Sequence, residues 1–300
     1  MSHNKRILIT GSNGLLGQKL SDAYLTKTNV IWMATGKGAN RHPQKDKIEY
    51  AQMDICNPEE VNKVLESFQP DVVIHTAAMT QVDDCEFEKE SCVALNIDAV
   101  AHLAKKSAEM NFRLVHLSTD FIFDGTKEMY TEDDEPNPLS YYGWSKLEAE
   151  KRVQEFAQNY AILRTVLVYG KVADMSRSNI MLWAYNTLKE GKSAKVVDDQ
   201  FRTPTLAEDL AAGCILAADA DQVGIYNIAG PEFLSIYDLV SKIAKMYHFS
   251  MESIEKVSSA NLNQPAKRPP ITGLDISKAR RDWGYAPKSL EEGIQTCLGF

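Results

Sequence analysis

The strongest constraint on the fold is a glycine-rich loop that joins an apolar run to a helical pattern. Residues 6–10 are apolar and β-branched, as in a buried strand, and Gly-Ser-Asn-Gly-Leu-Leu-Gly follows at residues 11–17. Leucines at helical spacing come next, so the loop opens a helix whose first N–H groups lack partners within that helix. Such a helix end attracts phosphate, because its unpaired N–H groups and its dipole carry partial positive charge.

Each glycine of this loop has a steric role in a dinucleotide site. The first permits the tight turn, the second lets the backbone approach a pyrophosphate, and the third lets the helix pack against the strand. Glycines also occur in plain turns, which is the alternative interpretation, but a first strand–helix junction is the context that the motif requires. The sequence therefore predicts cofactor binding by Gly11, Asn13, Gly14, Leu15, Leu16 and Gly17.

Apolar runs and helical segments alternate through the first half of the chain. Further apolar runs occupy residues 30–34, 71–75, 114–117 and 161–164. A chain that alternates in this way forms a parallel sheet with helices on both faces, and strands covered on both faces are apolar almost throughout. We therefore predict an α/β fold with a Rossmann-type doubly wound parallel sheet.

The pattern changes after Tyr169, where helices at residues 179–189 and 206–218 alternate with short strands. Residues 261–270 are rich in Asn, Pro and basic residues, which is typical of a loop. No flexible linker separates the two halves. We predict an NAD(P)-binding domain over residues 1–170 and a smaller C-terminal substrate-binding lobe over residues 171–300, partly interleaved with it.

Charge and cysteine content argue against several classes of protein. A formal net charge of −8 opposes broad nucleic-acid binding, because phosphate contacts require clustered Lys and Arg. The five cysteines are scattered and show neither C-x-x-C nor zinc-type spacing, so we expect reduced thiols and no metal site. We see no signal peptide and no apolar run of membrane-spanning length. The expectation is a cytoplasmic protein without a membrane or nucleic-acid partner.

Tyr142 and Lys146 form the predicted catalytic pair. On a helix these positions share one face, and a nearby ammonium is expected to lower the pKa of the phenol towards neutrality. Such a tyrosine can donate a proton to a carbonyl oxygen while hydride arrives at carbon, and the lysine can also hold the nicotinamide ribose. The spacing alone is common on helix faces. Its position after Pro138, downstream of a glycine loop, favours catalysis.

The segment at residues 117–120 ends a predicted strand, at the edge where ligands bind in open α/β sheets. Thr119 is our preferred third catalytic residue, because its hydroxyl can bond the substrate carbonyl. Ser118 is the competing candidate, and either residue can merely cap a helix. Asn96, on a long predicted helix, either orders the active site through its amide or is a satisfied buried amide.

The G-x-x-G-x-x-G spacing resembles the extended branch of the short-chain dehydrogenase/reductase superfamily. That resemblance implies that Asp54 contacts the adenine amino group and that Ile55 supplies apolar contact. The second predicted strand ends without an acid for the ribose 2′-hydroxyl. Lys37 or Arg41 can meet a 2′-phosphate there, the alternative being that both are solvated loop charges. We expect NADPH, with NADH as the alternative.

Longer segments resemble the dTDP-4-dehydrorhamnose reductase family. They are residues 73–83, Ser-Thr-Asp-Phe-Ile-Phe-Asp-Gly at 118–125, Tyr-Gly at 142–143, residues 164–170, Asp-Gln-Phe-Arg-Thr-Pro-Thr at 199–205 and Lys-Arg-Pro at 267–269. The resemblance implies NAD(P)H-dependent reduction of a 4-keto sugar on a deoxythymidine diphosphate carrier, giving dTDP-L-rhamnose. It also implies a cofactor lining of Ala77, Ala78 and Met79, sugar contacts from Thr119 and Asp120, and a position near the nucleotide for Arg268.

Several alternatives stay open on the sequence. Leu167 stands where that family commonly has a tryptophan beside the sugar, so the sugar is not identified. Phe121, in place of an acid after the Thr-Asp pair, argues against a dehydratase, whereas an epimerase would use the same tyrosine and lysine. The regulatory subunit of methionine adenosyltransferase resembles the same family and can retain both residues. The oligomeric state is also open, with a homodimer as one candidate.

Overall fold

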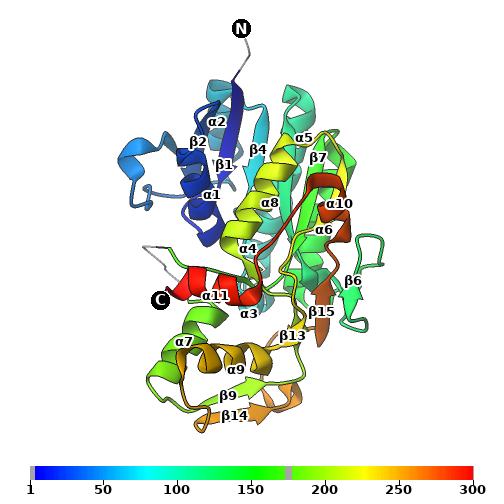
Figure 1. Cartoon of the computed structure of the whole chain (residues 1–300). Helices are drawn as coiled ribbons and strands as arrows, with labels where there is room; N and C mark the ends of the chain where they lie inside the picture. The colour runs from blue at the N-terminus through cyan, green and yellow to red at the C-terminus, as the bar shows by residue number, and fades with distance from the viewer. Residues whose placement is uncertain (1–3, 173–177, 300) are drawn as a thin grey trace.

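The computed structural model describes residues 4–172 and 178–299. These residues form a seven-stranded parallel sheet with helices on both faces, and a smaller lobe lies beyond the carboxyl end of β1 (Figure 1). The order across the sheet is β3 (Tyr50–Gln52), β2 (Val30–Gly36), β1 (Lys5–Thr10), β4 (Val72–His75), β5 (Arg113–Thr119), β7 (Tyr160–Thr165) and β12 (Gly224–Asn227). The predicted α/β fold is confirmed. The strand order reverses between β1 and β4, where open α/β sheets bind ligands.

Each face of the sheet has its own apolar core, because successive side chains of a strand point to opposite faces. Ile7 and Ile9 face one core and Leu8 faces the other. The first core is covered by α1 (Leu15–Leu25) and α8 (Ala207–Asp219). The second is covered by α2 (Pro58–Phe68), α5 (Ala99–Met110) and α6 (Tyr141–Phe156). Both faces are therefore closed to water, which leaves the strand ends as the place for a site.

The lobe has a third core. Its elements are α7 (Ile180–Lys189), α9 (Ile236–Tyr247), α11 (Leu290–Leu298) and the paired strands β9 (Ala194–Val197) and β14 (Ile254–Val257). A four-stranded sheet has the order β13 (Leu234–Ser235), β10 (Phe201–Arg202), β15 (Ile271–Leu274) and β6 (Met129–Tyr130). A further pair joins β8 (Val168–Tyr169) to β11 (Thr205–Leu206), and α10 (Ser277–Trp283) packs near β12.

The chain crosses more than once between the large sheet and the lobe. Strand β6 precedes residue 170 but pairs with β15, whereas α8 and β12 follow residue 171 and lie on the large sheet. Residues from both halves thus meet at the carboxyl ends of the strands. The domain limits at residues 170 and 171 stay a prediction.

Side-chain caps mark the first residues of two helices. Asn57 caps α2 by accepting from the N–H of Glu59, and Ser235 caps α9 in a reciprocal box with Asp238. The long helix predicted to carry Asn96 is confirmed, and a short helix α3 (Val82–Phe87) precedes it. The long helix consists of α4 (Lys89–Val93), α5 and, between them, a turn of π-helix at Ala94–Asp98. Such turns often mark functional positions, and this one carries Asn96.

No helix in the described part of the chain combines the length and the apolarity that a bilayer crossing requires. Within the same residues all five cysteines are free thiols, of which Cys56 is exposed and the other four are buried.

Candidate active site and cofactor cleft

The glycine-rich loop runs from β1 into α1, and two of its positions accept only glycine. Gly11 has a φ of +68°, and a Cβ there would lie 2.6 Å from the backbone nitrogen of Ala77. A Cβ on Gly17 would lie 2.4 Å from the carbonyl oxygen of Gly11. Because both clashes are with backbone atoms, no side-chain movement relieves them. The loop therefore packs closely against the segment that follows β4.

The N-terminus of α1 is free to receive an anion. Gly14 is its N-cap residue and no described side chain caps it, whereas side-chain oxygens cap the helices that follow Asn57, Ser140 and Ser235. The N–H groups of the first turn, which include those of Leu15 and Leu16, are thus available. The buried Ser12 hydroxyl also finds no partner among the described residues. These features fit the diphosphate of a dinucleotide.

Two predicted cofactor residues bond each other instead of standing free. The Lys37 ammonium lies 2.8 Å from the Asp54 carboxylate, and its hydrogen bond is the main cause of the lowered pKa of Asp54. The Lys37 side chain is 81% exposed, so this pair is accessible to a ligand. Ile55, the predicted apolar contact, is buried beside it. Adenine and 2′-phosphate contacts of these residues stay predictions.

Arg41 is tied directly to the glycine-rich loop. Its N–H donates to the Asn13 side-chain oxygen at 2.9 Å, and its guanidinium donates to the Asn13 carbonyl oxygen at 3.0 Å. The Asn13 amide also donates to the Ala39 carbonyl oxygen at 3.0 Å. Asn13 therefore fastens the segment after β2 over the phosphate loop and sets an exposed guanidinium there.

Asn96 connects the predicted cofactor lining with the catalytic helix. Residues 77–79 follow β4, and both backbone groups of Met79 bond the Asn96 amide, at 2.9 Å for the N–H and 3.1 Å for the carbonyl. The same amide donates to the Ser145 hydroxyl at 3.0 Å, and that hydroxyl donates to the Tyr142 carbonyl oxygen at 2.8 Å. Asn96 is 1% exposed. It is thus a satisfied buried amide that also orders the site.

Replacing Asn96 by alanine should lower the free energy of unfolding by about 2 kcal/mol and weaken NADPH binding, because Met79 would lose partners for both backbone groups. Urea unfolding and fluorescence titration measure the two effects. Ser235→Ala is a matched control, since it removes the cap of α9 in the lobe and should cost about 1 kcal/mol without changing NADPH binding. Unchanged cofactor affinity in Asn96→Ala would contradict the positioning role.

The predicted catalytic side chains meet at the carboxyl end of β5. Tyr142 lies in the first turn of α6, is 8% exposed, and has its phenol beside the Thr119 side chain. Burial raises the pKa of Tyr142 well above its ordinary value, and the Thr119 hydroxyl only partly opposes this. The expectation that Lys146 brings this pKa towards neutrality is therefore wrong for the protein without cofactor. The cause is loss of hydration at the phenol, which exceeds the effect of any neighbouring charge.

Lys146 lies one turn further along α6 and is 3% exposed. Its ammonium is 3.5 Å from Nε2 of His116. Burial lowers the pKa of Lys146 to about 8, and the Glu150 carboxylate is the main group that opposes this. A lysine in this state changes charge near neutral pH, as catalytic lysines often do.

The structure distinguishes Thr119 from Ser118. Ser118 donates its hydroxyl hydrogen to the Glu150 carboxylate, which also accepts two bonds from Arg164, at 3.0 and 2.8 Å. Because neighbouring residues of a strand point to opposite faces, Thr119 faces Tyr142 instead. Ser118 therefore belongs to a buried ion-pair network, and Thr119 is the hydroxyl that can reach a substrate.

Asp120, predicted to touch the sugar, is 2% exposed and fully engaged. Its carboxylate accepts from the Thr119 hydroxyl at 3.0 Å, accepts from Thr272, and lies 3.4 Å from Nε of Arg202. Burial raises the pKa of Asp120, and Arg202 opposes this. In this structure Asp120 orients Thr119, and its contact with a sugar stays a prediction.

Arg268 comes to the same end of the sheet from the loop before β15. Its guanidinium makes a two-pronged pair with the Asp83 carboxylate, at 3.1 and 2.9 Å, and this pair lowers the pKa of Asp83.

Leu167, between β7 and β8, has a φ of +43°, a conformation that disfavours side chains with a Cβ. Such backbone strain often lies at functional sites.

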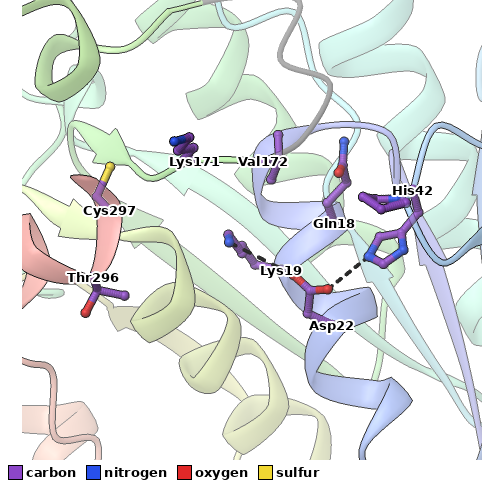
Figure 2. Close-up of a pocket in the computed structure, with 9 residues that line it drawn as sticks. Gln18, Lys19, Asp22, His42, Lys171, Val172, Thr296 and Cys297 are labelled. Carbon is purple, nitrogen blue, oxygen red and sulfur yellow. Dashed lines mark hydrogen bonds and ion pairs between the residues drawn. The ribbon is translucent and has the colours of Figure 1, made fainter. Parts of the chain in front are cut away.

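A separate polar pocket of about 310 Å³ lies beside α1 (Figure 2). Of its lining side chains, His42 lies 3.0 Å from Asp22, and Lys19 lies 3.0 Å from Glu208, which is outside the lining. None of the predicted catalytic residues lines it. The catalytic side chains therefore belong to a different place in the fold.

Several residues at the site were missed in the sequence. They are His75, His116, Glu150, Arg164, Arg202 and Thr272, all nearly fully buried. Buried charged residues are rare unless paired, so an arginine or glutamate within an apolar pattern was the signal that could have marked some of them.

Comparison with known proteins matches almost the whole chain to one protein family. The family model described as the RmlD substrate binding domain matches residues 5–299. The β subunit of methionine adenosyltransferase 2 from Bos taurus is 31% identical over 280 residues, which cover 92% of this chain and 81% of that protein. A probable low-salt glycan biosynthesis reductase from Haloferax volcanii is 32% identical over 288 residues, which cover 95% of both.

Solved structures agree with this result. A dTDP-4-dehydrorhamnose reductase from Clostridium acetobutylicum has a TM-score of 0.86 at 31% identity and covers 98% of both chains. A second, from Bacillus anthracis, was solved in complex with NADP and has a TM-score of 0.83 at 27% identity over 99% of both chains. The chain belongs to the RmlD substrate binding domain family.

Proposed function

We propose that this protein is an NAD(P)-dependent oxidoreductase that reduces the 4-keto group of a nucleotide-linked deoxysugar, with dTDP-4-dehydro-L-rhamnose as the favoured substrate. The observation that carries the proposal is the placement of the Thr119 hydroxyl beside the Tyr142 phenol, with buried Lys146 one helical turn further along α6, at the strand ends that also hold the glycine-rich loop. The reductase relatives support the chemistry, and the NADP complex of a structural relative supports the cofactor.

The raised pKa of Tyr142 suits a reduction. A phenol that stays protonated can give its hydroxyl hydrogen to the carbonyl oxygen of the keto sugar, while the Thr119 hydroxyl bonds the same oxygen. The glycine-rich loop would hold the diphosphate of the cofactor, which supplies hydride when bound. The Lys146 ammonium would hold the nicotinamide ribose and stabilise the phenolate that proton transfer leaves.

The decisive assay follows NADPH oxidation with purified dTDP-4-dehydro-L-rhamnose and identifies the product by NMR. Turnover with formation of dTDP-L-rhamnose would establish the proposal. Oxidation of NADPH only with another 4-keto nucleotide sugar would retain the chemistry and replace the substrate. Inactivity on all such sugars, with NADPH still bound, would contradict the proposal.

A second function is favoured by one comparison, the 31% identity to the methionine adenosyltransferase β subunit. Under this alternative the protein would bind a dinucleotide and a catalytic adenosyltransferase subunit without consuming the cofactor. Co-purification with that subunit, together with no turnover of any keto sugar, would support it. An epimerase would convert its substrate with no net consumption of NAD(P)H, so the same assay separates it from a reductase.

Arg41 is expected to set the preference for NADPH. Arg41→Ala should raise the KM for NADPH about tenfold and leave the KM for NADH nearly unchanged, because a guanidinium bonds a 2′-phosphate that NADH lacks. Lys37→Ala is the comparison, and its effect should be smaller because Asp54 already neutralises Lys37. Equal changes for both cofactors in Arg41→Ala would contradict this role.

A further inference from the structure

A row of polar side chains crosses the sheet beneath the predicted cofactor cleft. Thr10 on β1 is the register partner of His75 on β4, and His75 is the register partner of His116 on β5. Side chains at matching positions of neighbouring parallel strands point to the same face. The two imidazoles stack with centroids 5.6 Å apart and an interplanar angle of 17°, and both are at most 1% exposed.

The row ends at the catalytic helix. The Thr10 hydroxyl lies 2.7 Å from Nδ1 of His75, and Nε2 of His116 lies 3.5 Å from the Lys146 ammonium. The two remaining ring nitrogens, Nε2 of His75 and Nδ1 of His116, find no partner in the described part of the structure. Of this row, His116 is thus the member that contacts Lys146.

The charge states of these groups follow from their surroundings. Burial and the nearby Lys146 lower the pKa of His75 to about 3 and hold that of His116 well below its ordinary value. A neutral imidazole has one accepting nitrogen, whereas an ammonium only donates. Nε2 of His116 therefore accepts from Lys146, and the ring proton of His116 is on Nδ1.

We propose that His116 is a positioning residue that holds the Lys146 ammonium through Nε2, with His75 and Thr10 fixing its ring against the sheet. This inference rests on the role proposed above for Lys146 towards the cofactor. The structure shows no other sheet residue bonded to that ammonium within the described ranges.

The surroundings of Lys146 predict what loss of His116 would do. The titratable groups near it are Tyr142 and Glu150 on α6, Cys92 on α4, Cys85 on α3, His75 on β4 and His116 on β5. Glu150 is itself bonded to Arg164 and Ser118. Replacing the imidazole by a hydrocarbon removes an acceptor and makes the charged ammonium still less favourable. Lys146 should then lose its proton at lower pH.

The test measures the dissociation constant of NADPH between about pH 6 and about pH 10 for wild type, His116→Leu and His116→Gln. Wild-type binding should weaken as pH rises through about 8, where Lys146 loses its charge. In His116→Leu the midpoint should fall by about one pH unit. His116→Gln should keep the wild-type midpoint, because its amide oxygen is still an acceptor. His116→Met replaces the leucine variant if that protein does not fold.

Two control variants distinguish a failure of the role of His116 from a failure of the role of Lys146. His75→Leu removes the ring that stacks on His116 but no contact to Lys146, so it should lower thermal stability and shift the midpoint less than His116→Leu does. Equal midpoints in wild type and His116→Leu, or an equal shift in His75→Leu, would overturn the role of His116. In Lys146→Met the pH dependence through 8 should vanish. If it persists, the role proposed for Lys146 fails instead.

Discussion

Replacing Tyr142 by phenylalanine should lower kcat for keto-sugar reduction about 10²–10⁴-fold and leave NADPH binding nearly unchanged. The change removes only the hydroxyl that is the proposed proton donor. The ring should keep its place, because it packs with Cys85 and Cys92 and meets the edge of Phe121 at a centroid distance of 5.7 Å. Steady-state kinetics and a fluorescence titration of NADPH give the two quantities.

A neighbouring tyrosine provides a matched control. Tyr141 precedes Tyr142 on the same helix, and its ring packs on Trp144 with centroids 4.8 Å apart. Tyr141→Phe loses the same atom from a position without a proposed chemical role, so its kcat should stay near that of wild type. A Tyr142→Phe enzyme that retains most of its rate would show that another group donates the proton.

Removing the Glu150 carboxylate should produce a large loss of stability. Glu150→Leu is expected to lower the free energy of unfolding by about 3–5 kcal/mol, because it leaves the Arg164 guanidinium buried without its counter-charge. The two side chains are 2% and 3% exposed and lie 2.8 Å apart. Glu150→Gln should cost less, since it retains an oxygen that accepts from Arg164 and Ser118. Urea unfolding measures each loss.

A double variant and a surface pair complete that experiment. Glu150→Leu combined with Arg164→Met should recover part of the loss, because no unpaired charge remains buried. Glu155 on the same helix pairs with Arg152 at 2.7 Å, but both side chains are exposed. Glu155→Ala should therefore cost at most about 0.5 kcal/mol. If Glu150→Leu costs no more than Glu155→Ala, the network does not support the catalytic helix.

Features that depend on a few consecutive residues were predictable. The turn at Gly11 and the close packing at Gly17 follow from a strand that passes directly into a helix. The alternation of apolar runs with helical segments is equally local, and it predicts the doubly wound sheet that the structure shows. Tyr142 and Lys146 share a helix face for the same reason, because their spacing is fixed by the helical repeat.

Which side chains bond one another, and which are buried, depended on the tertiary structure. The sequence favoured Thr119 but left Ser118 as a competing hydroxyl, and only the packing of α6 on β5 directs Ser118 to Glu150 and Thr119 to Tyr142. In the same way, Lys37 after β2 bonds Asp54 after β3, and the pairing of these two strands brings the residues together.

The catalytic pair shows both contributions. Its identity and spacing are properties of the sequence alone. Its charge states are not, because burial raises the pKa of Tyr142 and lowers that of Lys146. The physical reason is that a spacing rule acts along one helix, whereas hydration and hydrogen bonding depend on which distant strands lie beneath it, as His116 on β5 does.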